Sequence, residues 1–245
     1  TKATTKISEA KEECPDKMFC KQKLCKRATT LHTEKCTNES TEGYCLVDGY
    51  KLNDEIMYGN IGTKGTLKVG DAFDCDVNGD GVYDAITERF YYVSMMTNGI
   101  TTDANTAVLI YYNNVSGGVA SNSTEYAYDS SGNNNGPVTA LAQLPTTSQW
   151  RTTLTNTKRQ ITTETGTTST SGGSLPIFSY EGYAARLLTA QEVNAGCGFT
   201  VGNYNHGEVS KQCKYLMENT RYASNSIINV GGWIENPNAS SSDVL

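Results

Sequence analysis

The sequence predicts an α+β protein that is mainly β, with long Thr/Ser/Asn/Gly loops. The chain has 245 residues, among them 32 Thr, 21 Asn, 19 Ser and 23 Gly. Thr favours strands, whereas Asn, Ser and Gly favour turns. Only 19% of the residues are charged and 9% are aromatic, a composition that fits neither a charged helical protein nor a disordered chain. No apolar run is long enough for a transmembrane helix.

The composition changes near residue 27. Residues 1–26 are rich in Lys and Cys without a clear period, and we expect a linker or tail there, followed by a β-rich domain over 27–245. The chain starts at Thr1 without a basic-then-apolar leader, which predicts a mature product or an excised fragment. Residues 1–36 hold nine Lys/Arg against five Asp/Glu, so the rest of the chain carries the negative charge. We therefore expect no nucleic acid partner.

Two strands are predicted in the first half of the domain. Residues 89–97 (RFYYVSMMT) and 106–114 (TAVLIYYNN) are rich in β-branched and aromatic residues. The segment between them has turn chemistry, so the two strands are expected to pair as a hairpin.

Helices are predicted to be few and short. Pro137 and Pro145 bracket a short helix, because proline is tolerated at a helix start and stops a helix that it follows. Thr189 and Glu192 have the spacing of a capping box, which opens a helix that Gly196 is expected to end. A further short helix is expected over 213–219. Residues 162–174 are too poor in apolar side chains for a core and are expected to form an exposed loop.

Eight cysteines, an even number, indicate disulfides and an oxidising compartment. The simplest bridges are local, Cys36–Cys45 and Cys197–Cys213. The other two bridges would join Cys14, Cys20, Cys25 and Cys75 in a pairing that the spacing leaves open. A zinc site is the alternative, although no CxxC spacing occurs.

One segment has the pattern of a Ca²⁺ loop. Counted from Asp76 as position 1, oxygen-bearing residues alternate and a glycine, Gly81, stands at position 6, where such a loop turns sharply. Alternation directs several oxygens at one hard cation, which takes six to eight of them. The predicted ligands are Asp76, Asn78, Asp80, Val82 through its carbonyl, Asp84 and Glu88.

This loop departs from an EF-hand. Position 12 is Thr87, and Glu88 comes one residue later. The flanking residues resemble strands, so we expect a Ca²⁺ loop within 74–88 in a β context, with a structural role. A metal-free hairpin turn is the alternative, because Asp, Asn and Gly also form turns. Mutual repulsion of Asp74, Asp76, Asp80 and Asp84 favours the cation.

No catalytic set is recognisable. His32 and His206 have no Ser or Cys partner in a catalytic context, and no GxSxG or phosphate-loop motif occurs. Glu181 and Glu192 could suggest a glycosidase pair, but helix capping explains Glu192. The sequence therefore predicts a protein that is not an enzyme.

The C-terminal stretch carries a family resemblance. The segments FSYEGYAARLLTAQEV, CKYLMENT and GGWIENPNASSSDV resemble a group of uncharacterised bacterial surface proteins whose C-terminal part is similar to the formylglycine-generating-enzyme and C-type-lectin-like fold. Of that superfamily's G-x-RLPT-x-x-E-W segment, Arg186, Leu187, Thr189 and Glu192 match at their own positions. Gly182 stands two residues earlier than the pattern places its glycine, Leu188 replaces Pro and Val193 replaces Trp.

This resemblance implies a C-type-lectin-like C-terminal half, at about 175–245. Enzymatic activity does not carry over, because Cys197 and Cys213 stand in the wrong context for the paired active-site cysteines. Glu235, Asn236 and Pro237 hold the residue types of the lectin EPN motif in another order.

These observations together predict a secreted or cell-surface bacterial protein that binds or adheres. Its expected partner is a surface glycan, a host or partner protein, or another copy of itself. Tyr, Ser, Asn and Gly make adaptable contact surfaces, and the expected exposed binding face contains Tyr204, Tyr222, Trp233 and Asn236. The alternative is a structural subunit of an extracellular filament or surface layer. An enzyme of the formylglycine-generating type is the third alternative.

Overall fold

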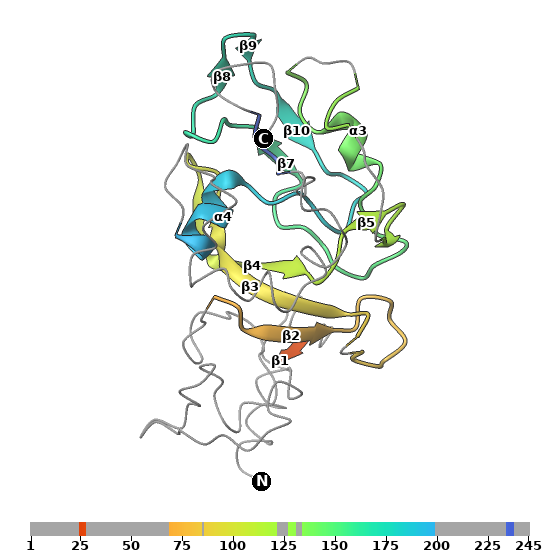
Figure 1. Ribbon diagram of the computed structural model, residues 1–245. Helices are drawn as coiled ribbons and strands as arrows, with labels where there is room; N and C mark the ends of the chain where they lie inside the picture. The colour runs from red at the N-terminus through yellow and green to blue at the C-terminus, as the bar shows by residue number, and fades with distance from the viewer. Residues whose placement is uncertain are drawn as a thin grey trace, which may run out of the picture.

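The computed structural model describes residues 25–27, 69–84, 86–121, 127–130, 134–198 and 234–237. Within them the protein is mainly β with two short helices, as the composition predicts. An antiparallel four-stranded sheet has the order β1-β2-β3-β4 (Figure 1). Its strands are β1 (Cys25–Arg27), β2 (Ala72–Cys75), β3 (Arg89–Thr97) and β4 (Thr102–Tyr111).

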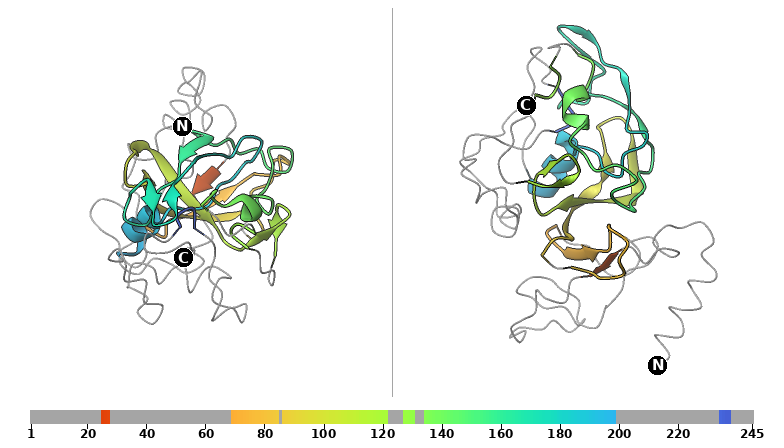
Figure 2. Two further views of the ribbon diagram at one scale, coloured as in Figure 1. Left: turned by 90° about the horizontal axis from the view of Figure 1, so that it is seen from above. Right: turned by 90° about the vertical axis from the view of Figure 1, so that its right-hand side faces the viewer.

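The other described elements lie on the side of β3 and β4 away from β1 and β2 (Figure 1; Figure 2, right). Three small antiparallel pairs, β5–β6, β7–β10 and β8–β9, and the helices α3 and α4 make up this part. The strand bounds are Val115–Ser116 for β5, Val119–Ala120 for β6, Lys158–Gln160 for β7, Ser169–Thr170 for β8, Gly173–Ser174 for β9 and Ile177–Ser179 for β10. None of the described helices is long and apolar enough to cross a membrane.

The predicted hairpin is present, with a shorter turn than expected. β3 has the predicted bounds, but β4 begins at Thr102 and ends at Tyr111 instead of covering 106–114. The side chain of Asn98 accepts hydrogen bonds from the N–H groups of Ile100 and Thr101, and Gly99 has φ of 85°. This side chain closes the turn within residues 98–101, so the chain returns to the sheet earlier than the apolar pattern indicates.

β1 lies across the domain boundary expected at residue 26. It pairs with β2, and Cys25 lies opposite Cys75, to which it is joined by a disulfide. Both cysteines are buried with Phe73, Phe90 and Tyr92 in one hydrophobic cluster. The end of the expected tail is therefore part of the sheet, and Cys25–Cys75 is one of the pairings that the spacing left open.

The other expected disulfides lie wholly or partly outside the described residues. Cys197 is disulfide-bonded, but the expected partner, Cys213, is outside the description, so this pairing stays a prediction. Cys14, Cys20, Cys36 and Cys45 also lie outside it, as does the helix expected over 213–219.

Replacing Cys25 and Cys75 together by serine should destabilise the sheet. The bridge spans 50 residues of sequence, and the chain-entropy model gives about 4 kcal/mol for a loop of that length. Urea unfolding of the double variant should show this loss in the free energy of unfolding. An unchanged midpoint and slope would contradict it, and the unreduced parent chain is the reference.

Helix α4 (Ala190–Cys197) has the predicted start and a later end. The Thr189 hydroxyl accepts from the N–H of Glu192, whose carboxylate accepts from the N–H of Thr189, which confirms the capping box. The helix continues through Gly196, where we expect it to end, and stops at Cys197, with the left-handed Gly198 (φ of 70°) as its C-cap. Gly196 serves packing instead, since a Cβ there would lie 2.7 Å from the carbonyl oxygen of Val93 on β3.

Helix α3 (Val138–Leu141) begins directly after Pro137, as predicted.

The tract 162–174 was expected to be an exposed loop, and this is wrong for its first three residues. Thr162, Thr163 and Glu164 are buried. Their polar groups are paired: the hydroxyl of Thr162 donates to the carbonyl oxygen of Asn98, and the hydroxyl of Thr163 pairs with that of Thr167. Threonine can enter a core when its hydroxyl finds a partner, which apolar content alone does not reveal. The remainder is exposed around the β8–β9 hairpin.

Candidate metal-binding loop

The predicted Ca²⁺ loop connects β2 to β3 at one end of the sheet, on the right in Figure 1. The ladder between the two strands continues up to its base, where the N–H of Cys75 donates to the carbonyl oxygen of Glu88 over 3.0 Å. The Cys25–Cys75 disulfide immediately precedes Asp76. Both ends of the loop are therefore fixed by the sheet.

Short hydrogen bonds from side chain to backbone shape the loop. Asp76 accepts from the N–H groups of Gly79 (2.9 Å) and Gly81 (3.2 Å). Asn78 accepts from Asp80 (2.8 Å), and Asp80 from Val82 (2.7 Å). Each oxygen that accepts one N–H keeps a second lone pair. The loop thus gathers several oxygens around one turn, with glycine at the left-handed positions 79 and 81.

Glu88 lies beneath the loop and closes it. Its side chain is only 2% exposed. One carboxylate oxygen accepts from the N–H groups of Val77 (3.0 Å) and Asn78 (3.2 Å), and the other accepts from that of Asp84 (3.2 Å). Burial raises the pKa of Glu88, and these three hydrogen bonds oppose the rise. An ionised group in this place is costly unless more positive charge is near it.

Three of the predicted ligands converge. Asp76, Asp80 and Glu88 each offer a carboxylate oxygen, and these oxygens lie within 4.8 Å of one another. Oxygens that bind one Ca²⁺ at about 2.3–2.6 Å can be at most about 5 Å apart, so the three can share one cation. The side-chain oxygens of Asn78 and Asp84 accept hydrogen bonds from backbone N–H groups of the loop. That these two residues and the Val82 carbonyl also bind the metal stays a prediction. The N–H of Ile86 lowers the pKa of Asp84.

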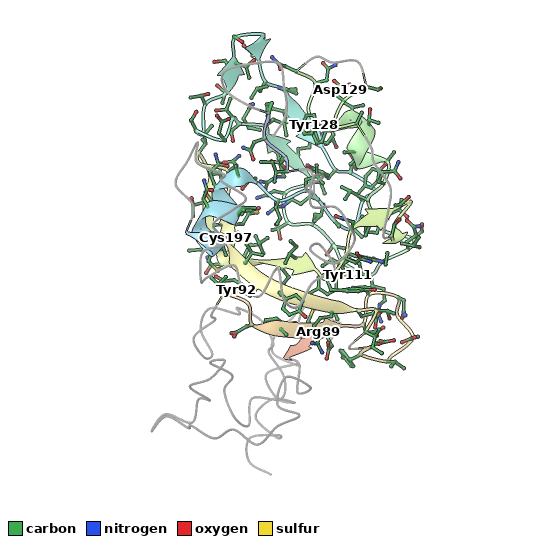
Figure 3. The ribbon with its side chains drawn as sticks, viewed as in Figure 1. Arg89, Tyr92, Tyr111, Tyr128, Asp129 and Cys197 are labelled. Carbon is green, nitrogen blue, oxygen red and sulfur yellow. A yellow bond between two sulfur atoms is a disulfide. The ribbon has the colours of Figure 1, made fainter. Side chains whose placement is uncertain are left out.

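Asp74 was counted among the mutually repelling carboxylates, and this is wrong. Its side chain accepts a 2.6 Å hydrogen bond from Arg89, opposite it on β3 (Figure 3). Asp76 lies just beyond the end of β2, and its carboxylate accepts from the loop N–H groups of Gly79 and Gly81 instead. Glu88 is the acidic residue that joins the cluster instead.

A segment distant in the sequence holds the loop from outside. Arg151 donates its backbone N–H to the carbonyl oxygen of Val77 (2.7 Å), and its guanidinium contacts the Asp76 carboxylate at 3.2 Å. Trp150 packs edge-on against Phe90 and Tyr111. The Tyr111 hydroxyl donates to the carbonyl oxygen of Thr87 near the far end of the loop (2.7 Å). No local pattern predicts Arg151, because 75 residues separate it from Asp76.

Replacing Arg151 by glutamine should tighten cation binding. The Arg151 side chain is 43% exposed and places a positive charge on one predicted ligand, so it competes with a cation for Asp76. We expect Arg151→Gln to lower the Ca²⁺ dissociation constant by about three- to tenfold at low salt. Arg151→Lys keeps the charge and should bind as the parent does. Calorimetric titration measures the Ca²⁺ dissociation constants of both variants. Weaker Ca²⁺ binding by Arg151→Gln would contradict the idea that Arg151 competes with the cation for Asp76.

The expected binding face is only partly within the description. Tyr204, Tyr222 and Trp233 lie outside the described residues. Asn236 lies inside them but is 1% exposed, so its expected place on an exposed face is wrong. Its side chain accepts from the N–H of Ala190 at the start of α4 and donates to the carbonyl oxygens of Thr162 and Thr163. Asn236 therefore connects the start of α4 to the segment that follows β7.

A buried polar cluster surrounds this segment, and composition does not predict it. Glu235 pairs with Arg159 at 3.0 Å, and Arg186 pairs with Glu192 at 2.6 Å. Burial alone would lower the pKa of Arg186, but the neighbouring acidic groups, Glu192 first and then Glu235 and Tyr180, together raise it. The Tyr128 hydroxyl, which lies in the same part of the molecule (Figure 3), donates to the Glu235 carbonyl oxygen. Glu181 is exposed, while Glu192 is used in the cap and the ion pair.

Comparisons with known proteins add no relationship to this geometry. No protein-family model matches the sequence, and searches of curated proteins and of solved structures found no significant match.

Proposed function

We propose that this protein is a binding or adhesion module that works outside the cytosol and is stabilised by one Ca²⁺ ion in the 76–88 loop. The observation that carries the metal assignment is the convergence of Asp76, Asp80 and Glu88 within 4.8 Å. Carboxylate oxygens are the ligands of hard cations, and a bound cation offsets the cost of the buried Glu88 carboxylate. The role that we propose for the ion is structural, because all of its predicted ligands come from this one loop.

Two observations support an extracellular setting. The Cys25–Cys75 disulfide lies in the core beside Phe73 and Phe90, and structural disulfides persist in oxidising compartments. Extracellular Ca²⁺ is also abundant enough to fill sites whose dissociation constants are about 10⁻⁴–10⁻³ M. The bacterial cell surface is the location that we propose.

The C-type-lectin-like assignment of the C-terminal half is also a proposal. Arg186, Thr189 and Glu192, which match the superfamily segment, form one connected cluster at the start of α4. Glu235 and Asn236 bind the same region, since the N–H of Glu235 donates to the Leu188 carbonyl oxygen. These contacts support a shared structural role for the matching residues, and they point to scaffolding and not to sugar ligation by Asn236.

Calcium should raise the melting temperature of the full chain. At a free concentration of 100 times the dissociation constant, one site adds about 2.7 kcal/mol, which corresponds to about 5–10 °C for a chain of this size. Differential scanning calorimetry after chelation, with and without added Ca²⁺, measures this shift. Mg²⁺ at equal concentration is the control, because it demands a tighter octahedral site. An identical melting temperature in all three conditions would refute the metal assignment.

Binding is tested separately from the metal. The full chain should be applied to a glycan array and to a panel of candidate host surface proteins, with Ca²⁺ and with chelator. Saturable binding to one class supports the proposal. Electron microscopy of the same sample tests the alternative, since regular filaments without ligand binding would favour a structural subunit.

A further inference from the structure

Asn78 is followed by Gly79 in the exposed part of the loop, and this dipeptide has an intrinsic chemistry. A glycine after asparagine has no Cβ to shield its backbone nitrogen, which can attack the amide carbon of the preceding side chain and close a five-membered ring. The chain contains two further described pairs of this kind, Asn98–Gly99 and Asn135–Gly136. The three pairs share the dipeptide and differ in their surroundings.

The surroundings of Asn78 supply the groups that ring closure needs. The attacking N–H of Gly79 donates to the Asp76 carboxylate over 2.9 Å. The amide oxygen of Asn78, on which charge develops, accepts the N–H of Asp80 over 2.8 Å, and the amide nitrogen that must leave donates to the Asp80 carboxylate over 3.2 Å. A base on the nucleophile and a donor on the developing oxyanion are the elements of acyl-transfer catalysis.

We propose that Asn78 is a self-modification site, at which the loop converts its own asparagine to aspartate or isoaspartate. In the first step the Gly79 nitrogen bonds to Asn78 Cγ and gives its proton to Asp76. The amide nitrogen then takes up that proton and leaves as ammonia, so a succinimide remains. Water opens either C–N bond of the ring. The net reaction consumes one water, releases one ammonia and needs no oxidant or reductant.

Each of the two other pairs has one buried residue, Asn98 in the first and Gly136 in the second. Asn98 is 5% exposed, its amide nitrogen donates to the Gln160 carbonyl oxygen, and the N–H of Gly99 donates to the Thr97 hydroxyl and not to a carboxylate. Gly136 is buried, and a Cβ on it would lie 2.9 Å from the Phe178 ring. Ring closure at either site requires that packed groups move, whereas Asn78, Gly79 and Asp80 are all exposed.

The modification changes the candidate cation site, a consequence that rests on the proposed function. Aspartate at position 78 adds a carboxylate beside Asp76 and Asp80. Isoaspartate instead lengthens the backbone by one carbon and disrupts the turn that Gly79 makes with φ of 81°. The reaction itself requires no metal, so its failure and the failure of the proposed function are distinguishable.

The test is peptide mapping by mass spectrometry of the full, disulfide-intact chain, incubated at neutral pH with chelator. Deamidation adds about 1 Da and a new charge. In the folded chain Asn78 should react at least about tenfold faster than Asn98 and Asn135. In urea, after reduction, the three rates should converge, because the difference comes from the fold. Equal rates in the folded chain, or Asn78 as the slowest site, would overturn the proposal.

The variant Asp76→Asn tests whether Asn78 reacts fast because Asp76 acts as a base or only because Asn78 is exposed. This variant keeps the size of the side chain and removes the base, so the rate at Asn78 should fall by about tenfold or more, while the rates at Asn98 and Asn135 stay unchanged and report that the rest of the fold is intact. Glu181→Gln, an exposed carboxylate outside the loop, is the matched control. An unchanged or faster reaction at Asn78 in Asp76→Asn would overturn the role of Asp76.

Discussion

Glu88→Gln should reduce Ca²⁺ affinity by about 100-fold or more. The change removes one of three converging negative charges from a position that is 2% exposed, where charges are poorly screened. It also turns one accepting oxygen into an NH₂ group. That group cannot accept from the backbone N–H groups that now bind the carboxylate, those of Val77 and Asn78 at one oxygen and that of Asp84 at the other.

Isothermal titration calorimetry of Glu88→Gln and the parent measures this loss. Glu181→Gln makes the same chemical change at an exposed residue of the second half and should leave affinity unchanged. The affinities can be compared only if the Glu88→Gln protein is folded, which circular dichroism checks. Parent-like affinity in a folded Glu88→Gln protein would mean that the loop does not bind the cation through Glu88.

Glu192→Ala should destabilise the fold by about 3–5 kcal/mol. Glu192 is fully buried, and its carboxylate accepts from the Arg186 guanidinium and from the N–H groups of Thr97 and Thr189. Removal of Glu192 leaves a buried guanidinium without its counter-ion, and such an uncompensated charge strongly destabilises a folded protein. The capping box of α4 and the contact with the end of β3 are lost with it.

A double-mutant cycle separates the charge from the cap. Arg186→Met in the Glu192→Ala background removes the unpaired charge, so the double variant should recover part of the lost stability. Glu181→Ala, an exposed change, should alter the free energy of unfolding by less than about 0.5 kcal/mol. Urea unfolding measures the parent, the two single variants Glu192→Ala and Arg186→Met, the double variant and Glu181→Ala. A loss below about 1 kcal/mol in Glu192→Ala would show that the pair contributes little.

The same cluster explains why residues far from α4 can affect it. Asn236 accepts from the first N–H of the helix, and Glu235 pairs with Arg159 of β7. The short segment 234–237 therefore connects the helix start with the β7–β10 pair. Asn236 is predicted to lie on a binding surface, but it and Glu235 are buried, so both serve the interior of the domain.

The local patterns of the sequence determined much of what lies close along the chain. The β-branched and aromatic run over 89–97 became β3 with the same bounds, and the Thr189–Glu192 spacing became a capping box. The alternating oxygens from Asp76 onward became a loop in which the Asp76 and Asp80 carboxylates accept from backbone N–H groups two or three residues ahead. In each case the interacting groups are a few residues apart, so their spacing alone fixes the geometry.

Only the tertiary structure decided which distant groups meet. It assigned Asp74 to Arg89, placed Arg151 on the Asp76 carboxylate and brought Cys25 opposite Cys75. It also buried Asn236, because the N–H of α4 and the carbonyl oxygens after β7 together satisfy its amide. Such contacts depend on how strands pair and layers pack, and no periodicity in the sequence encodes a partner many residues away. The amino-acid pattern thus specified the loop, while the fold selected its charged neighbours.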